Sequence, residues 1–278
     1  RNEQSLLRRF YQTHANASNE AFLERRRGKF VRRDRFCGGI HGLRMSQFVV
    51  VASNHLAVLL INHMTKIKLT IEYVGTDFCG WQSQASGNSV QDNVERALRA
   101  YLDVDFARIY GAGRTDAGVH AVGQVAHFVT DKTVNPYKLC LGVNLSLPST
   151  IAVTSAEIVN DDFDARFSAV SKTYCYRVYV SPTRKPTLDV NCCQVYKPLD
   201  VAKMERAAKL LVGQHDFCAF QKTGSNLKGT VRTVNSFQVT DTGSVIEFRV
   251  NGNAFLYNQV RIMCGLLIEV GKGKLDES

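Results

Sequence analysis

A glycine-rich stretch placed directly before an alternating apolar segment constrains this chain more than any other feature. Its glycines are Gly111, Gly113, Gly118 and Gly123. Glycine is common where the backbone turns tightly, adopts a positive φ or approaches another segment closely. Residues 124–130, which follow at once, have the apolar alternation of a strand. The pattern predicts a loop that leads into a strand, with Arg114 and Asp116 held on its edge.

Two common uses of such a loop are excluded by its residues. A dinucleotide-binding loop needs glycine or alanine three residues after Gly113, where Asp116 stands, and a carboxylate there would repel a pyrophosphate. A P-loop needs Gly-Lys-Ser or Gly-Lys-Thr, which the chain lacks. The residues alone leave two interpretations open, a turn that Asp116 caps and a loop that presents Asp116 for chemistry.

The string Gly-Arg-Thr-Asp-Ala-Gly-Val-His-Ala at residues 113–121 resembles the signature loop of the TruA-type tRNA pseudouridine synthases. Further segments match in the order of that family. They are residues 77–82, 163–169, 172–176, 213–220 and 253–265. The similarity covers about residues 64–270 and leaves the start of the chain unexplained.

Residues 1–63 are predicted to be a basic extension that is disordered or not native to the folded body. Of the formal net charge of +10, +7 falls within residues 1–44, where eleven lysines and arginines stand against four acids. A segment of this kind is typical of disorder, of an organellar presequence or of a nucleic-acid-binding arm. It could equally be sequence upstream of the true start, since Met64 opens the first strand-like run.

Neither a membrane span nor a metal site is predicted. The apolar run at residues 48–61 is interrupted by polar residues and is shorter than the roughly 20 residues that a span requires. The eight cysteines include no Cys-x-x-Cys pair, so free thiols in a reducing compartment are expected. The predicted location is the cytoplasm, or an organelle if the N-terminus is a presequence. His120 and His127 are predicted to be structural, because no acids cluster beside them.

The first half of the body, residues 64–170, has the pattern β-α-β-β-α-β. Alternating apolar residues predict a first strand from Lys66 to Tyr73, and Ser89 with Asp92 resembles a capping box at a helix start. This helix is expected to bury Val90, Val94, Ala97, Leu98 and Tyr101. The remaining elements are strands at residues 106–110, 124–130 and 151–159 and a helix that begins at Asn135 and Pro136.

The same order begins again in residues 171–278. Residues 172–180 read as a strand, and Asp200 caps a helix that Gly213 ends. The later elements are strands at 231–240 and 244–250 around a turn at 241–243, and a helical apolar stripe from Leu256 to Val270. No final strand follows, so the second half is predicted to be C-terminally incomplete.

The predicted fold class is α+β, with two ferredoxin-like β-α-β-β-α-β halves that form a mostly antiparallel sheet with a central cleft. The resemblance implies the same architecture, in which both halves meet along one sheet and the catalytic cleft lies between them. Members of the family continue past the position of Val270, which implies that this chain is truncated.

The resemblance also implies an isomerase that converts uridine to pseudouridine in the anticodon stem-loop of tRNA by base flipping. The product is an isomer, so no cofactor or metal is expected. Asp116 is the implied catalytic carboxylate, acting by attack on the sugar or base or by proton abstraction from the ribose 2′ carbon. Arg261, on the helix after the last hairpin, is expected to keep Asp116 charged in a cleft that excludes water.

Two further residues are assigned to the substrate by the same resemblance. Arg114 is expected to fill the stack that the flipped base leaves, and Tyr174 to stack on the target uracil. Tyr176 is expected to pack in the interior. Trp81, Gln82 and Phe220 lie in segments that shape the cleft in the family, although both aromatic rings suit a core equally well.

The implied partners are tRNA and a second copy of the chain, in a homodimer. Basic residues expected to contact RNA are Arg184, Lys185, Lys222 and Lys228. Two rival functions stay open, an RNA-binding protein or folding helper that performs no chemistry, and a small-molecule hydrolase that uses Asp116 and His120. A pure binder has no use for a carboxylate facing phosphates, and the hydrolase lacks a second acid or base at a defined spacing.

Overall fold

The computed structural model describes residues 64–85, 87–105, 107–222 and 229–276. Every described residue belongs to the compact unit Asn62–Ser278. The predicted basic extension, Cys37 and Lys228 lie outside the described residues. Within the described part of the chain, no helix combines the length and apolar character needed to cross a bilayer.

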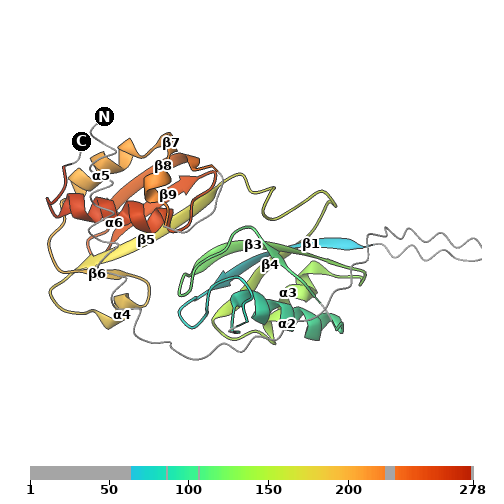
Figure 1. Cartoon of the computed structure of the whole chain (residues 1–278). Helices are drawn as coiled ribbons and strands as arrows, with labels where there is room; N and C mark the ends of the chain where they lie inside the picture. Colours follow the sequence, from blue (N-terminus) through green and yellow to red (C-terminus); the bar gives the residue numbers. More distant parts are fainter. Residues whose placement is uncertain (1–63, 86, 106, 223–228, 277–278) are drawn as a thin grey trace, which may run out of the picture. The chain divides into compact units, whose positions relative to one another are not determined.

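The first sheet has the strand order β2-β3-β1-β4, and every neighbouring pair in it is antiparallel. Its elements are β1 (Thr65–Tyr73), α2 (Val90–Leu102), β2 (Tyr110–Gly111), β3 (Ala121–Thr130), α3 (Pro136–Asn144) and β4 (Ile151–Val159). Figure 1 shows α2 and α3 together on one face of this sheet. The predicted order β-α-β-β-α-β is confirmed here, and so are the bounds of the last strand.

Alternation and capping explain most of these elements. Every second residue of β1 is buried, and Ile67 and Leu69 are completely inaccessible. At the start of α2, the Ser89 hydroxyl accepts from the Asp92 N–H at 3.0 Å, and the Asp92 carboxylate accepts from the Ser89 N–H at 3.3 Å. The prediction for Tyr101 is wrong, because its ring packs over Gly142 in α3 and stays 37% exposed.

The strand predicted at residues 106–110 is shorter than expected. β2 contains only Tyr110 and Gly111, and residue 106 lies outside the described residues. Just before β2, two side chains of α2 make the hydrogen bonds to the backbone that a neighbouring strand would otherwise make. The Glu95 carboxylate accepts from the Ile109 N–H at 3.1 Å, and Gln91 Nε2 donates to the Ile109 carbonyl at 3.2 Å.

The second sheet has the strand order β6-β5-β9-β8-β7, in which only the β5–β6 pair is parallel. Its strands are β5 (Lys172–Val180), β6 (Cys193–Val195), β7 (Gly213–Asp216), β8 (Val231–Asp241) and β9 (Ile246–Gly252). Its helices are α4 (Pro186–Asp189), α5 (Val201–Leu210), the 3-10 turn η1 (Cys218–Phe220) and α6 (Gln259–Gly271). In Figure 1, α5 and α6 lie next to each other against this sheet.

Short elements account for most differences from the prediction in this half. α4, β6 and β7 have four, three and four residues, which is too few for a hydrophobic period to be visible in the sequence. β6 pairs with Val178–Val180 at the edge of β5, in the place that β4 takes beside β1 in the first sheet. Among the described residues, no strand follows α6.

The α+β class with mostly antiparallel strands is confirmed. The strands are nevertheless divided between a sheet of four strands and a sheet of five, and no ladder joins the two within the described residues. The single shared sheet that the resemblance implied is therefore not formed by these strands. The boundary between halves at residue 170 stays a prediction.

Replacing Ser89 with alanine tests the capping box. Ser89→Ala removes the acceptor of the Asp92 N–H at a completely buried cap, so we expect the free energy of unfolding to fall by about 1 kcal/mol. Urea denaturation followed by circular dichroism measures this change. Ser244→Ala, at an exposed serine before β9, is the control and should leave the unfolding free energy unchanged. Equal losses in both variants would contradict the assignment.

Candidate active site

The glycine loop, residues 111–118, is anchored by backbone hydrogen bonds to neighbouring segments. The Ala112 N–H donates to the Val125 carbonyl at 2.7 Å. The Thr115 carbonyl accepts from the Trp81 N–H at 3.1 Å. The Gly118 N–H donates to the Phe78 carbonyl at 3.3 Å. The loop is therefore tied both to β3 and to the segment that follows β1.

Side chains hold the same loop from three strands. Lys172 on β5 donates its ammonium to the Ala112 carbonyl at 2.8 Å, and Gln124 on β3 donates its amide to the Gly113 carbonyl at 2.7 Å. Tyr73 on β1 shares a hydrogen bond of 2.9 Å with the Thr115 hydroxyl. Burial lowers the pKa of Lys172 and raises the pKa of Tyr73. Both side chains form hydrogen bonds to the loop, so their role is to position it.

Two positions of the loop require glycine, one because of close packing and one because of its backbone conformation. A Cβ on Gly111 would lie 2.5 Å from Nε1 of the buried Trp81. Gly118 has φ +77°, which side chains rarely adopt. Trp81 is thus a core residue that supports the loop from behind. Phe220 is also buried, against Phe217, so it belongs to the core of the second half.

Asp116 and Arg261, which are far apart in the sequence, meet at the glycine loop. Arg261 Nε lies 4.0 Å from Asp116 Oδ2, and the two side chains are 54% and 40% exposed. Among the described residues, the carboxylate accepts no hydrogen bond and forms no other ion pair, so it does not cap the turn. The expected exclusion of water is not found, because loops and a helix end surround the carboxylate instead of packed sheets.

Tyr174 lies within electrostatic range of the Asp116 carboxylate. Burial raises the pKa of the Tyr174 hydroxyl, and the charge of Asp116 raises it further. Its ring meets Phe255 edge to face at 5.2 Å between centroids, which fixes the plane of the ring. Tyr176 packs against Phe248 instead, as predicted, and burial raises its pKa.

A pocket of about 530 Å³ opens at Asp116 and Arg261. Its walls are Cys79, Gln82, Gln84, Arg114, Thr115, Asp116, Ala117, Lys222, Tyr257, Asn258 and Arg261. Arg114 is exposed at this wall, whereas Tyr174 is not one of the lining residues. The pocket also receives the N-terminal end of α6, whose helix dipole favours a negative charge such as that of Asp116.

The sequence predicted an RNA contact for Lys222 but gave no role to several of its neighbours in this pocket. The Lys222 ammonium lies 5.2 Å from the centre of the Tyr257 ring, and the Lys222 N–H donates to the Tyr257 carbonyl at 3.2 Å. Asn258 has φ 61° at the start of α6. Cys79, Tyr257 and Asn258 fall inside the matched segments, but only the structure shows that these three residues line the pocket. Gln84 lies outside the matched segments, so nothing in the sequence indicated that it would line the pocket.

The histidines behave as predicted. His120 Nδ1 accepts from the Gly75 N–H at 3.2 Å, and His127 Nδ1 accepts from the Ala165 N–H at 3.1 Å. Since His120 does not line the pocket, the structure gives no support to a hydrolase that pairs it with Asp116. The described cysteines are free, and no cluster of metal-binding side chains occurs among the described residues.

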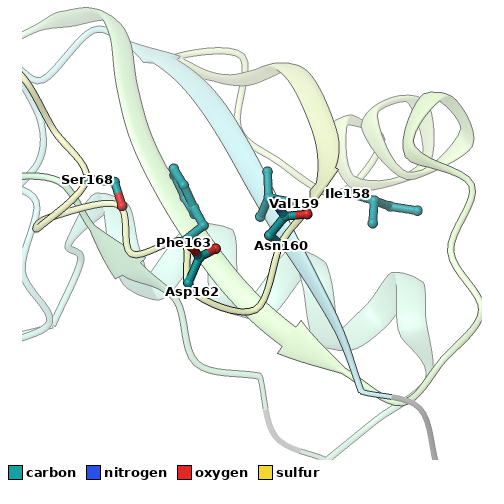
Figure 2. A pocket seen from close by; sticks show the side chains of 6 residues that line it. All are labelled: Ile158, Val159, Asn160, Asp162, Phe163 and Ser168. Carbon is teal, nitrogen blue, oxygen red and sulfur yellow. The ribbon is translucent and has the colours of Figure 1, made fainter.

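A second pocket, of about 450 Å³, lies at the end of β4 (Figure 2). It is lined by Ile158, Val159, Asn160, Asp162, Phe163 and Ser168. None of the predicted site residues lines it, and it contains no pair of charged groups like Asp116 and Arg261. The first pocket is therefore the candidate active site.

The chain is similar to known proteins over most of its length. Residues 69–168 and 207–278 match the family model described as tRNA pseudouridine synthase. The chain is 44% identical to tRNA pseudouridine synthase A of Ruminiclostridium cellulolyticum, over 77% of this chain and 88% of that protein. It is 46% identical to tRNA pseudouridine synthase A of Syntrophotalea carbinolica, over 76% of this chain and 83% of that protein.

Similarity to solved structures is weaker. A chain in the crystal structure of a Cbf5–Nop10–Gar1 complex aligns with 73% of this chain and 45% of that chain, at 16% identity and a TM-score of 0.34. At this level the likeness carries no argument about the site.

Gly111→Ala tests whether Trp81 supports the glycine loop. The added methyl group would overlap the indole, so the indole or the loop must shift and the close packing around Trp81 is lost. We expect its fluorescence emission to shift to longer wavelength and the free energy of unfolding to fall by roughly 1–3 kcal/mol. The chain has one tryptophan, so the signal is unambiguous. Gly123→Ala is the control, because nothing lies within 4 Å of its added Cβ. Unchanged emission in Gly111→Ala would contradict the proposed support.

Proposed function

The chain belongs to the tRNA pseudouridine synthase family, and we propose that it isomerises uridine to pseudouridine in the anticodon arm of tRNA, with Asp116 as the catalytic carboxylate. The observation that carries this proposal is the meeting of Asp116 with Arg261 at a pocket large enough for a nucleoside. Family membership supports the type of reaction that we propose. The pocket supports our assignment of the reaction to this part of the structure.

The reaction exchanges one bond for another within the nucleotide. The bond from N1 to the ribose C1′ breaks, a bond from C5 to C1′ forms, a proton leaves C5, and N1 ends the reaction protonated. No electrons are gained or lost overall. One ionised carboxylate beside the sugar is sufficient for this reaction. It can attack the sugar, attack the base, or take a proton from the 2′ carbon.

Two features of the site place positive charge beside the Asp116 carboxylate. The guanidinium of Arg261 stands within ion-pair distance, and the N-terminal end of α6 lies at the same pocket. Because both side chains are partly exposed, the pair is screened by water until a substrate covers it. The bound nucleotide would then strengthen the attraction by displacing that water.

The neighbouring side chains suit an extruded nucleotide. Tyr174, held edge to face by Phe255, offers a ring for the uracil beside Asp116. Arg114 is exposed on the glycine loop, where it can enter the RNA stack in place of the flipped base. This placement requires the target nucleotide to leave its helix.

Contacts with the tRNA backbone are proposed for a smaller set of basic residues than the sequence indicated. Lys222 lines the pocket over Tyr257, where an ammonium can meet the phosphate of the extruded nucleotide. Arg184 is paired with Asp189 at 3.1 Å, so it is less free to bind phosphate. The homodimer that the resemblance implied stays a prediction.

Asp116→Asn tests the proposed chemistry against a protein that only binds RNA. The amide keeps the shape of the side chain but has no charge, so we expect pseudouridine formation to fall below detection while tRNA binding remains. Release of tritium from tRNA that carries 5-tritiated uridine measures turnover, because the proton on C5 must leave. Asp131→Asn, at an exposed aspartate outside the site, is the matched control.

The outcomes separate the rival functions. Full turnover in Asp131→Asn together with none in Asp116→Asn supports the assignment. Turnover in Asp116→Asn near that of the unchanged protein contradicts the role of this carboxylate. RNA binding by the unchanged protein without any tritium release favours a binding protein without chemistry.

Tyr174 is tested by two substitutions that separate its ring from its hydroxyl. Tyr174→Leu removes the stacking surface, and we expect kcat/KM to fall about 10- to 100-fold, in line with about 1–3 kcal/mol for stacking one base. Tyr174→Phe keeps the ring and should lose less than Tyr174→Leu. Equal losses in the two variants would assign the function of Tyr174 to its hydroxyl instead of its ring.

A further inference from the structure

Gln82, which lines the pocket with Asp116, is the outer end of a chain of hydrogen-bonded side chains that runs into the interior. Gln82 Nε2 donates to Gln91 Oε1 at 2.8 Å, and Gln91 Nε2 donates to Glu95 Oε1 at 2.8 Å. Gln91 and Glu95 are 2% and 6% exposed. Buried polar groups with several partners have few alternative positions, so Gln82 is held firmly from behind.

Fixed donors and acceptors determine which way the Gln91 amide points. Its oxygen lies 3.0 Å from the backbone nitrogen of Ser83, which can only donate a hydrogen bond. Its nitrogen lies 3.2 Å from the carbonyl oxygen of Ile109, which can only accept. An inverted amide would set oxygen against oxygen and N–H against N–H. The atom of Gln82 that faces the Gln91 oxygen must therefore be its amide nitrogen.

The carbonyl oxygen of Gln82 is consequently left as the free end of the side chain. It has no hydrogen-bond partner among the described residues, and it is not one of their buried unpaired atoms, so solvent reaches it. Because Gln82 lines the pocket, this oxygen can meet a ligand there. The site thus offers an oriented acceptor close to its carboxylate.

In uridine, N1 is bonded to the sugar and carries no hydrogen, so N3 has the only ring N–H group of the uracil. Cytosine has no hydrogen at that position, so an acceptor facing N3 favours uracil over cytosine. N3 also has a special place in the reaction. A half-turn of the ring about the line through N3 and C6 exchanges N1 with C5 and O2 with O4, while N3–H stays where it was. An acceptor for N3–H can therefore hold the base throughout the exchange of bonds.

We infer that the Gln82 carbonyl oxygen accepts the N3–H of the extruded uracil and acts as the pivot about which the detached ring turns. Gln82 is then a specificity-determining residue, and Gln91 is the positioning residue that orients it. This inference rests on the proposed function, since it assigns a contact within the same site. The other donor that an extruded nucleotide could offer to this oxygen is the ribose 2′-hydroxyl.

Methylation of the target uracil at N3 distinguishes the two donors. RNAs of one sequence, with either uridine or 3-methyluridine at the target position, are incubated with the unchanged protein and with Gln82→Ala. The methyl group removes the N3–H but leaves N1 and C5 free to react, so the isomer can still form. Mass spectrometry of the nucleosides under single-turnover conditions gives the rate for each combination.

We expect the unchanged protein to convert 3-methyluridine at least about tenfold more slowly than uridine, the factor that one neutral hydrogen bond provides. Gln82→Ala should convert uridine about tenfold more slowly and show less than about a twofold further loss on 3-methylation. A penalty for the methyl group that is the same in both proteins overturns the inference, because the oxygen would then serve the ribose or no substrate group.

Gln84→Ala is the matched control, since Gln84 also lines the pocket and also has its amide nitrogen engaged, at 3.0 Å from the Cys79 carbonyl. Whatever its effect on the rate, it should keep the discrimination against 3-methyluridine. If Gln82→Ala has a lowered melting temperature, Gln82→Met replaces it, because methionine keeps the length without the acceptor. Failure of the unchanged protein to convert uridine would refute the proposed function itself.

Discussion

The position of Asp116 depends on the packing of Trp81 against Gly111. The indole occupies the space that any side chain at residue 111 would need, and its backbone N–H holds the Thr115 carbonyl next to Asp116. Hydrogen bonds from Tyr73 and Lys172 fix the same loop. These contacts fix the backbone of the loop from which the Asp116 side chain extends. Such fixed geometry is what a reaction at a single sugar carbon requires.

The site is completed by residues from both sheets and the helix that follows them. The glycine loop belongs to the first half, whereas Lys172 and Arg261 come from β5 and α6 of the second. Asp116 comes from the first half and Arg261 from the second, so neither half alone contains this ion pair. The chain of hydrogen-bonded side chains from Gln82 to Glu95 fixes a second wall of the pocket. Glu95 and Gln91 also hold the backbone of Ile109, just before the glycine loop. One network therefore orients two sides of the pocket.

Local patterns predicted the parts of the fold that local interactions stabilise. The alternation in β1 and the capping box at Ser89 are visible in the sequence because neighbouring residues produce them. β6 was not predicted, since three residues have no period and their pairing with β5 is not local. The meeting of Asp116 with Arg261 came only from the family resemblance, because no local rule links residues so distant. The orientation of Gln82 depends on the Ser83 N–H and the Ile109 carbonyl in space, which no pattern could show.

The most direct test is a crystal structure of the protein with an RNA that carries 5-fluorouridine at the target position. Fluorine replaces the proton that must leave C5, so the reaction cannot finish and the nucleotide remains in the site. The predicted result is an extruded base in the pocket, with the Asp116 carboxylate touching the target nucleotide and the Gln82 oxygen within about 3 Å of N3. A base that stays stacked in the RNA, or that lies in the pocket away from Asp116, would contradict the central claim.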